Sequence, residues 1–318
     1  MKDRYGREIN YLRISLTDLC NLRCVYCMPA EGVNKLCHRD ILSIEEIAEI
    51  AAAAVELGIT KIRLTGGEPL VRRGILDLVR RLHALPGLEE LALTTNGLLL
   101  PEMAAALKEA GLTRVNISLD TLNPDTYRRL TRIGELEQAL AGIRAAQDAG
   151  LGPIKLNAVL VGGVNDMEIP ELVAMTRDAP VELRFIELMP IGDAEVFGPE
   201  AYLPVDTVLQ RIPELQPLPS DHGGVARLYT LPGARGRVGL ISPVSCSFCS
   251  RCNRIRLTAD GYLKPCLHSG KELPLRGLHG EALREAIRAA VNAKPEAHAE
   301  LSATERSDAG RNMNEIGG

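Results

Sequence analysis

Six short strand-like runs that alternate with amphipathic helical patterns constrain the fold of this chain more than any other feature. The runs span residues 12–17, 61–65, 91–95, 114–120, 154–160 and 182–188, and helical patterns span 44–57, 75–85, 101–110, 137–149 and 168–178. Repeated β–α units predict a parallel sheet with right-handed crossovers. Six units are two short of a closed eight-stranded barrel. We therefore expect an α/β fold, a partial (βα)6 TIM-like barrel open along one side.

One face of these runs is polar. Alternate positions along the first, second, third and fifth runs carry Arg13, Lys61 and Arg63, Thr94, and Lys155. A closed barrel fills its interior with branched apolar side chains, so a cationic face predicts a charged ligand in the lumen. The alternative is a half-covered sheet whose polar face meets solvent. The sixth run alternates too weakly for its faces to be assigned.

The character of the sequence changes after Pro190. Residues 190–236 are rich in Pro and Gly, and short strand-like pieces follow at 237–241, 254–258 and 262–266, the last two joined by a hairpin signal at 259–261. We expect a partial barrel over residues 1–220 and a smaller C-terminal module over 221–318. That module carries Cys246, Cys249, Cys252 and Cys266, a set that could close either a zinc or an iron–sulfur site.

Three further cysteines, Cys20, Cys24 and Cys27, are spaced as C-x3-C-x2-C. A structural zinc ion or an electron-transfer cluster takes four ligands from the protein, so three thiolates leave one metal position for a substrate or cofactor. The spacing also differs from both ferredoxin patterns. The run therefore indicates a metal site that carries out chemistry.

Composition excludes several classes of protein. Apolar residues make up 46% and charged residues 25% of the 318 residues, and the formal net charge is −4. These values are those of a globular chain and argue against a general nucleic-acid binder. The N-terminus has no apolar signal region, and no segment reaches 18 apolar residues, so we expect a cytoplasmic protein that does not enter a membrane. Its thiols should stay reduced.

The first cysteine run resembles the signature of the radical S-adenosylmethionine (SAM) superfamily. Nearly the whole chain resembles one family within it, the radical SAM enzymes that open molybdenum cofactor biosynthesis. The resemblance is carried by the cysteine run, by the stretches 63–69, 94–97, 116–120, 184–189 and 248–256, and by the terminal Gly317-Gly318.

This resemblance implies two [4Fe–4S] clusters and bound SAM. It assigns the cluster ligands to Cys20, Cys24, Cys27, Cys249, Cys252 and Cys266. It assigns SAM contacts to Tyr26, Gly67, Ser118 and Met189. It assigns contacts with a GTP substrate to Arg13, Lys61, Arg63, Thr94, Lys155, Arg254, Ile255 and Arg256, and catalytic roles to Arg13, Arg184, Gly317 and Gly318. Cys246 falls where the family usually has no cysteine, so it could add a fourth thiolate, and Cys37 is expected to be structural.

The resemblance also implies a reaction. A 5′-deoxyadenosyl radical removes hydrogen from ribose C3′ of GTP, and C3′ then bonds to guanine C8, which gives (8S)-3′,8-cyclo-7,8-dihydroguanosine 5′-triphosphate. The expected partners are a second copy of the chain, an external one-electron reductant and a downstream cyclic pyranopterin monophosphate synthase, with neither nucleic acid nor membrane. The last residues, 295–318, have the composition of a disordered tail, whereas the resemblance implies that they reach the active site.

Two other interpretations remain. A radical SAM peptide maturase can carry an auxiliary C-terminal cluster, but it would have no use for the Arg254 and Arg256 pair or the Gly-Gly end. A zinc-dependent binding module or a plain electron carrier would use the same cysteines without radical chemistry.

Overall fold

The computed structural model describes residues 1–33, 38–219, 224–302, 305 and 307–317. In this part of the chain, twelve strands form one sheet in the order β12-β11-β10-β1-β2-β3-β4-β5-β6-β9-β8-β7. The strands are β1 (Tyr11–Ser15), β2 (Lys61–Thr65), β3 (Glu90–Thr95), β4 (Arg114–Ser118), β5 (Lys155–Leu160), β6 (Glu182–Glu187), β7 (Gln216–Leu218), β8 (Arg227–Thr230), β9 (Arg237–Ile241), β10 (Arg254–Leu257), β11 (Tyr262–Lys264) and β12 (Leu273–Pro274).

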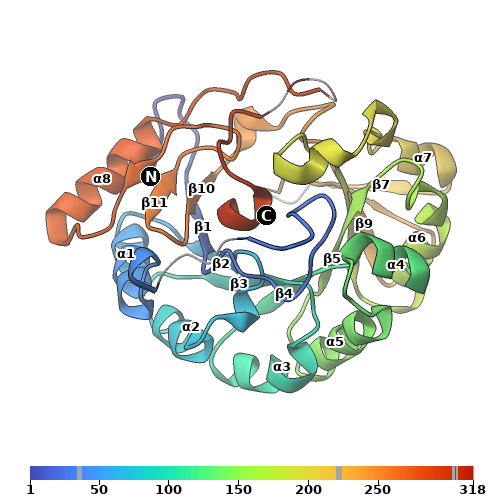
Figure 1. Ribbon diagram of the computed structural model, residues 1–318, viewed down its shortest axis with the longest axis horizontal. Coiled ribbons are helices and arrows are strands. Elements are labelled where there is room, and N and C mark those ends of the chain that lie inside the picture. Colours follow the sequence, from blue (N-terminus) through green and yellow to red (C-terminus); the bar gives the residue numbers. More distant parts are fainter. Residues whose placement is uncertain (34–37, 220–223, 303–304, 306, 318) are drawn as a thin grey trace.

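The six expected strands are β1 to β6, which lie side by side in chain order and run parallel. Their bounds differ from the expected ones by no more than two residues at each end. Figure 1 shows the sheet curving around a central space, with the helices along its outer side. The partial α/β barrel is therefore confirmed.

Five helices follow the expected patterns, and the described part of the chain contains four more. They are α1 (Ile44–Glu56), α2 (Ile75–His83), α3 (Leu100–Glu109), α4 (Pro124–Thr131), α5 (Leu136–Asp148), α6 (Ile169–Asp178), α7 (Thr207–Arg211), α8 (Gly280–Asn292) and α9 (Met313–Ile316). The helices α4, α7, α8 and α9 were not expected. A start signal for α4 is present, because Asn123 accepts a hydrogen bond from the Thr126 amide and Pro124 occupies the first turn.

Strands from the C-terminal third extend both edges of the barrel sheet. β10 pairs in parallel with β1, and β9 pairs in parallel with β6. β11 and β12 then continue one edge, and β8 and β7 the other, with antiparallel pairing. The expected C-terminal module thus shares its sheet with the barrel, and the expected boundary at 220/221 falls among residues 220–223, outside those described.

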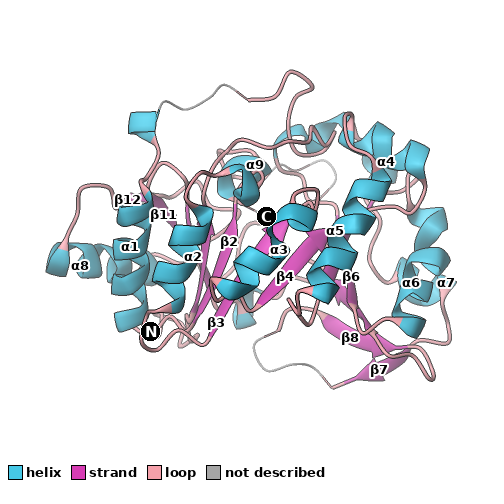
Figure 2. Cartoon of the chain, turned by 90° about the horizontal axis from the view of Figure 1, so that it is seen from below, coloured by secondary structure: helices cyan, strands magenta, loops and turns pink. Residues whose placement is uncertain are grey.

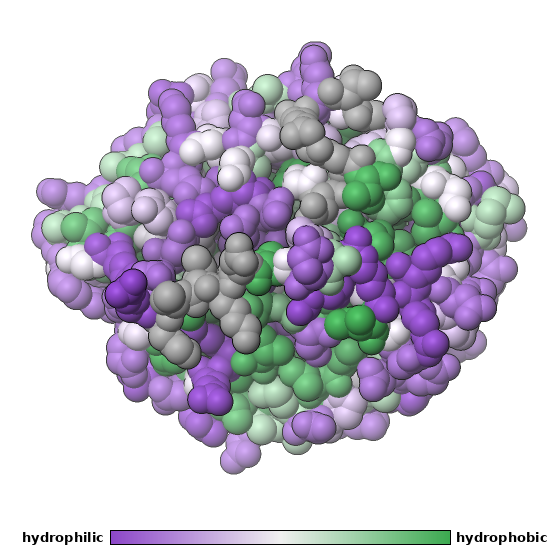
Figure 3. Space-filling view, viewed as in Figure 1, coloured by the Kyte–Doolittle hydropathy of each residue, from purple (hydrophilic) through white to green (hydrophobic). Residues whose placement is uncertain are grey.

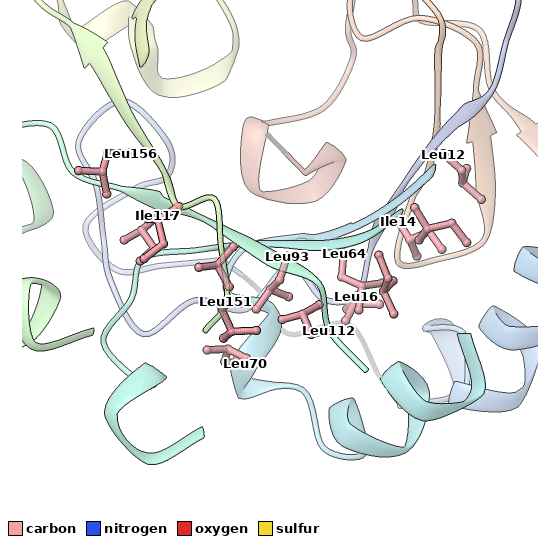
Figure 4. Packing of buried hydrophobic residues seen from close by; sticks show 14 of the residues in the cluster. Leu12, Ile14, Leu16, Leu64, Leu70, Leu93, Leu112, Ile117, Leu151 and Leu156 are labelled. Carbon is pink, nitrogen blue, oxygen red and sulfur yellow. The ribbon is translucent and has the colours of Figure 1, made fainter. Parts of the chain in front are cut away.

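The main hydrophobic core lies between the sheet and its outer helices. Leu12, Ile14 and Leu64 are fully buried there, and Figure 4 shows them pointing to the same side of the sheet. Because side chains alternate along a strand, the residues between them, such as Arg13 and Arg63, point to the inner face. Burial of the apolar face therefore fixes which side chains enter the lumen.

The chain returns to the lumen at its end. In Figure 2, α9 lies over the ends of the central strands, and Ile316 is fully buried. Hydrophilic side chains dominate the rim of the face in Figure 3, and hydrophobic ones gather toward its middle and lower part. Among the described residues, no helix has both the length and the apolar character needed to span a bilayer.

Candidate active site

A cavity lined by the first group of cysteines lies at the carboxyl ends of the central strands. All seven residues expected to hold the first cluster and SAM line it, namely Cys20, Cys24, Cys27, Tyr26, Gly67, Ser118 and Met189. They come from the loop after β1, from the loops after β2 and β6, and from the end of β4. The carboxyl ends of parallel strands share one edge of a sheet, which explains how residues so distant in sequence meet.

Two glycines let the backbone approach this cavity closely. Gly66 has φ +136°, a region that favours glycine. A Cβ on Gly67 would overlap the carbonyl oxygen of Leu19, in the segment that leads to the cysteines. The next residue, Glu68, is fully buried and accepts bonds from Thr95 Oγ1 and the Asn96 amide at 2.9 and 2.8 Å. The Gly-Gly-Glu stretch therefore ties the end of β2 to both neighbouring loops.

Tyr26 is fixed by a buried carboxylate. Its hydroxyl donates to Asp120 Oδ2 at 2.5 Å, while Asp120 Oδ1 accepts from the Val159 amide at 2.8 Å. Burial raises the pKa of Asp120 to about 6, against the effect of these two bonds. The pair holds the ring of Tyr26 beside Cys24 and Cys27.

The chemistry of the first three thiols fits a cluster. Burial raises the pKa of Cys20 to about 11 and that of Cys24 well above the ordinary value, so positive charge from iron is needed to keep them as thiolates. No three described Cys, His, Asp or Glu side chains are placed to hold a single metal ion. A four-iron cluster is larger than one ion and keeps its thiolates further apart, so the cavity suits a cluster better than zinc.

A second, arginine-lined cavity adjoins the first, and the two share Asn157, Ile186, Met189 and Met313. The pairing of the strands determines which side chains form the wall of this cavity. Arg13 of β1 lies opposite Arg256 of β10 on one side and Arg63 of β2 on the other, and Arg254 precedes Arg256 by two positions on the same face of β10. These four side chains form the arginine row. Burial and the neighbouring Arg254 lower the pKa of Arg13 to about 10, which leaves it charged at neutral pH.

This row has no counter-charge in the described part of the chain. No described carboxylate lies within ion-pair distance of Arg13, Arg63 or Arg254, and the Nε atom of each is buried without a hydrogen-bond partner. Buried unpaired donors are costly. An anion with several acceptor oxygens is the ligand that would satisfy them.

The cations on the other side of the lumen are paired. Glu182 accepts from Arg184 and lies 3.4 Å from Lys155 Nζ. Burial opposes ionisation of Glu182, but Arg184 and Lys155 outweigh it and lower its pKa to about 2. Lys155 and Arg184 thus share one carboxylate on the inner face of the sheet, where Arg184 lines the arginine-lined cavity and Lys155 lines neither cavity. The cationic lumen expected from the strand pattern is present, and β6 contributes Arg184 and Ile186 to it.

The other residues expected to contact the substrate, Thr94, Lys61 and Ile255, do not lie in the arginine-lined cavity. Thr94 lines the first cavity, and its Oγ1 is buried without a partner. Lys61 begins β2 on the same face as Arg63 but is only half-buried and lines neither cavity. Ile255 packs in the main core, because strand alternation turns it away from Arg254 and Arg256. Its side chain does not face the lumen, so only its main chain could meet a substrate.

In the second group of cysteines, three thiols line a cavity and one does not. Cys249, Cys252 and Cys266 line the arginine-lined cavity, whereas Cys246 is exposed and does not. Lys294, with 2% of its surface exposed, donates to the carbonyls of Arg254 and Pro265 at 2.8 Å each. Burial works against a Cys252 thiolate, but Lys294 and Arg254 outweigh it and lower the pKa of this thiol to about 7. These three thiols are the better candidate ligands.

The C-terminal tail completes the wall of the lumen. Arg256 Nη1 donates to the carbonyl of Gly317 at 2.5 Å. Upstream, Arg311 bridges Asp260 and Glu272, and the fully buried Lys264 holds the Ala309 carbonyl at 3.0 Å. Gly318 and Cys37 lie outside the described residues.

The residues that sequence reasoning did not assign to the site include Tyr11, Asp120, Glu182 and Lys294, each of which contacts a residue of it. Asp120 and Glu182 belong to strands that were recognised, but their partners depend on strand register. Tyr11 stands two positions before Arg13 on the same face of β1, so alternation would have revealed it had the strand been started one residue earlier. Lys294 has no signal around it, because its place comes from the docking of α8.

Two family models match the chain. The radical SAM superfamily matches residues 14–176, and the family described as Molybdenum Cofactor Synthesis C matches residues 181–300. Solved structures agree on the fold. SuiB of Streptococcus suis aligns with a TM-score of 0.60 at 14% identity over 90% of this chain and 69% of that one. The structure of anSMEcpe with bound AdoMet aligns at 0.57 and 13% identity over 89% and 82%.

Relatives with a stated activity are much more similar in sequence. The GTP 3′,8-cyclase of Alkaliphilus oremlandii is 50% identical over the full length of both chains. The enzyme of the same name from Peptoclostridium acidaminophilum is 55% identical over 93% of this chain and 92% of its own. That from Moorella thermoacetica is 53% identical over 94% and 95%. The chain belongs to the radical SAM superfamily and, within it, to the GTP 3′,8-cyclase family.

Proposed function

We propose that this protein is a radical SAM enzyme that converts GTP to (8S)-3′,8-cyclo-7,8-dihydroguanosine 5′-triphosphate, the first step of molybdenum cofactor biosynthesis. The observation that carries the proposal is the junction of two cavities, one with three thiols and one with a row of buried arginines that lack carboxylate partners. A zinc-binding module or an electron carrier would have no use for that row.

The arginine row binds the triphosphate in this proposal. A triphosphate carries three to four negative charges, and Arg13, Arg63 and Arg254 offer buried N–H groups with no competing carboxylate among the described residues. Lys155 and Arg184 contribute less net charge because they share Glu182. With the phosphates against β10, β1 and β2, the sugar and base extend toward Asn157, Ile186 and Met189, which belong to both cavities.

The first cavity holds the radical-generating cofactors. Cys20, Cys24 and Cys27 would ligate a [4Fe–4S] cluster, and Gly67, Ser118 and Met189 would contact SAM. When bound, the cluster and SAM supply the one-electron chemistry that generates a radical able to abstract hydrogen from ribose. The chain itself places the ribose beside that chemistry and keeps water out, and Tyr26, fixed by Asp120, forms part of the wall.

A second [4Fe–4S] cluster would be held by Cys249, Cys252 and Cys266, without Cys246, which lies apart from the cavity. Closing the new bond in GTP leaves the product radical one electron and one proton short, and a cluster held by these thiols would supply that electron. We further propose that the enzyme works as a homodimer in the cytoplasm, takes electrons from an external reductant and delivers its product to a cyclic pyranopterin monophosphate synthase.

The test is anaerobic incubation of the reconstituted protein with GTP, SAM and dithionite, followed by chromatography and mass spectrometry. We expect 5′-deoxyadenosine and a cyclised product of the same mass as GTP. GTP deuterated at C3′ should transfer its label to 5′-deoxyadenosine. Formation of 5′-deoxyadenosine with no label and no cyclised nucleotide would refute the proposed substrate and return attention to a peptide substrate.

A further inference from the structure

One aromatic ring lies among three of the unpaired arginines. The guanidinium carbons of Arg13, Arg63 and Arg254 stand over the ring of Tyr11 at 5.8, 5.4 and 5.7 Å from its centroid. These are cation–π distances. Tyr11 itself is buried, with 7% of its surface exposed, and no other described tyrosine or phenylalanine ring has three guanidinium groups over it.

Strand register explains the arrangement. Tyr11 begins β1 and pairs with Arg254 of β10 on one side and with Lys61 of β2 on the other. Arg13 is two residues further along β1 and so points to the same face. Arg63 is the partner of Arg13. The backbone of β1 therefore fixes the ring on the inner face of the sheet, beside the arginine row.

Among the described residues, Tyr11 is the one aromatic ring that all three arginines share, and Arg254 also stands over the ring of Phe248 at 5.7 Å. Their Nε atoms are buried and unbonded, no described carboxylate pairs with them, and their like charges repel one another. The face of an aromatic ring carries the negative part of its quadrupole and attracts cations. The same positive charges also act on the tyrosine hydroxyl. Burial opposes ionisation of this hydroxyl, but Arg63, Arg13 and Arg254 outweigh the effect of burial and lower the pKa of Tyr11.

We propose that Tyr11 is the positioning residue of the polyphosphate site, and that its ring holds Arg13, Arg63 and Arg254 in a fixed cage before the nucleotide arrives. The inference rests on the proposed function, because it assumes that the row binds the triphosphate of GTP. Without the ring, the three side chains would separate to reduce repulsion. Binding would then require them to be gathered again, which lowers the affinity. One desolvated cation–π contact corresponds to roughly five- to thirtyfold in affinity.

The experiment compares GTP, inorganic tripolyphosphate and SAM as ligands of the holoenzyme by anaerobic titration calorimetry. Tyr11→Leu should weaken both GTP and tripolyphosphate by roughly ten- to a hundredfold and leave SAM unchanged. Tyr11→Phe keeps the ring and should stay within about threefold of wild type. Tyr5→Leu is the matched control, since Arg4 and Arg7 also stack on Tyr5 at 4.9 and 5.3 Å, but outside both cavities.

A graded series separates electrostatics from shape. Replacing Tyr11 with phenylalanine and then with mono-, di- and trifluorophenylalanine keeps the ring but progressively removes the negative charge from its face. Affinity for tripolyphosphate should fall stepwise along the series, an effect that a space-filling role would not produce. This series also serves if Tyr11→Leu fails to fold.

The possible outcomes are distinct. Unchanged tripolyphosphate affinity in Tyr11→Leu, or a flat fluorine series, would overturn the inference about Tyr11. Wild-type holoenzyme that binds tripolyphosphate but not GTP would instead refute the proposed substrate, and the tripolyphosphate measurements would still decide the role of Tyr11.

Discussion

Changing Gly317 to alanine should separate SAM cleavage from product formation. Gly317 has φ +79°, and an added Cβ would lie 2.9 Å from Thr65 Cβ and would overlap Thr65 Oγ1. Thr65 cannot move aside easily, because it is buried at the end of β2 and its hydroxyl donates to the Ile14 carbonyl at 3.2 Å. The alanine must therefore leave the position that Gly317 occupies.

The cost can be worked out from two contributions. A left-handed backbone costs alanine about 1–2 kcal/mol more than glycine. Leaving the position also breaks the bond from Arg256 to the Gly317 carbonyl, and a hydrogen bond to a charged group is worth about 1.5–3 kcal/mol. Together these give about 2.5–5 kcal/mol against the docked end of the tail, which lowers its population by roughly seventyfold or more.

The damage should stay local. Arg311 and Lys264 hold the tail upstream through Asp260, Glu272 and the Ala309 carbonyl, and alanine at 317 touches none of these contacts. We therefore expect normal folding, normal iron content and nearly normal GTP affinity. Formation of the cyclised product should fall at least tenfold, while 5′-deoxyadenosine formation persists, because Arg256 loses the group that fixes it.

Gly310→Ala is the matched control within the same tail. Gly310 also has a positive φ, +67°, but a Cβ there would meet nothing within 4 Å. It carries the backbone strain without the collision and without the bond to Arg256, so the cyclised product should stay close to wild type. Wild-type yield from Gly317→Ala, or equal losses from both variants, would refute the argument from the fit of the tail.

Three other outcomes follow from the site. Reconstituted protein should hold about eight irons per chain; Cys24→Ser should abolish SAM cleavage while Cys249→Ser spares much of it, and loss of the same spectroscopic signal in both would contradict two separate sites. Cys246→Ser should keep both clusters and most activity, because Cys246 is exposed and away from the cavity; loss of the second cluster's spectrum would instead favour four thiolates. Arg254→Ala and Arg256→Ala should each weaken GTP binding about ten- to a hundredfold in calorimetry, since a buried charge-assisted contact is lost; equal affinities would show that these arginines do not meet the nucleotide.

The strand pattern predicted the lumen of this protein well, because two constraints coincide. Leu12 and Ile14 must be buried against the helices, and alternation then forces Arg13 to the other face. The same reasoning placed Arg63 and Lys155 correctly. It failed to assign β6, where Glu182, Arg184 and Ile186 mix charged and apolar side chains on the inner face.

Pairing between distant segments could not be predicted from the sequence. The C-terminal strands were expected in a separate module, yet β10 joins β1 and β9 joins β6. Period-2 patterns show that a segment is a strand but not which edge it joins, since that depends on packing of the whole chain. For the same reason the neighbouring positions of Arg256, Arg13 and Arg63 became visible only with the register.

The division of charge in the lumen suggests why the tail and the nucleotide can both use Arg256. The charge of Lys155 on β5 and Arg184 on β6 is partly offset by Glu182, whereas Arg13, Arg63, Arg254 and Arg256 on β1, β2 and β10 meet no described carboxylate. Arg256 belongs to the second group, and a guanidinium has five N–H donors, so it can hold the Gly317 carbonyl and still bind a phosphate oxygen. Loss of the tail then frees Arg256 to move but removes none of the positive charge. The nucleotide should still bind, and what should fail is its alignment for bond formation, whereas Arg256→Ala should impair both.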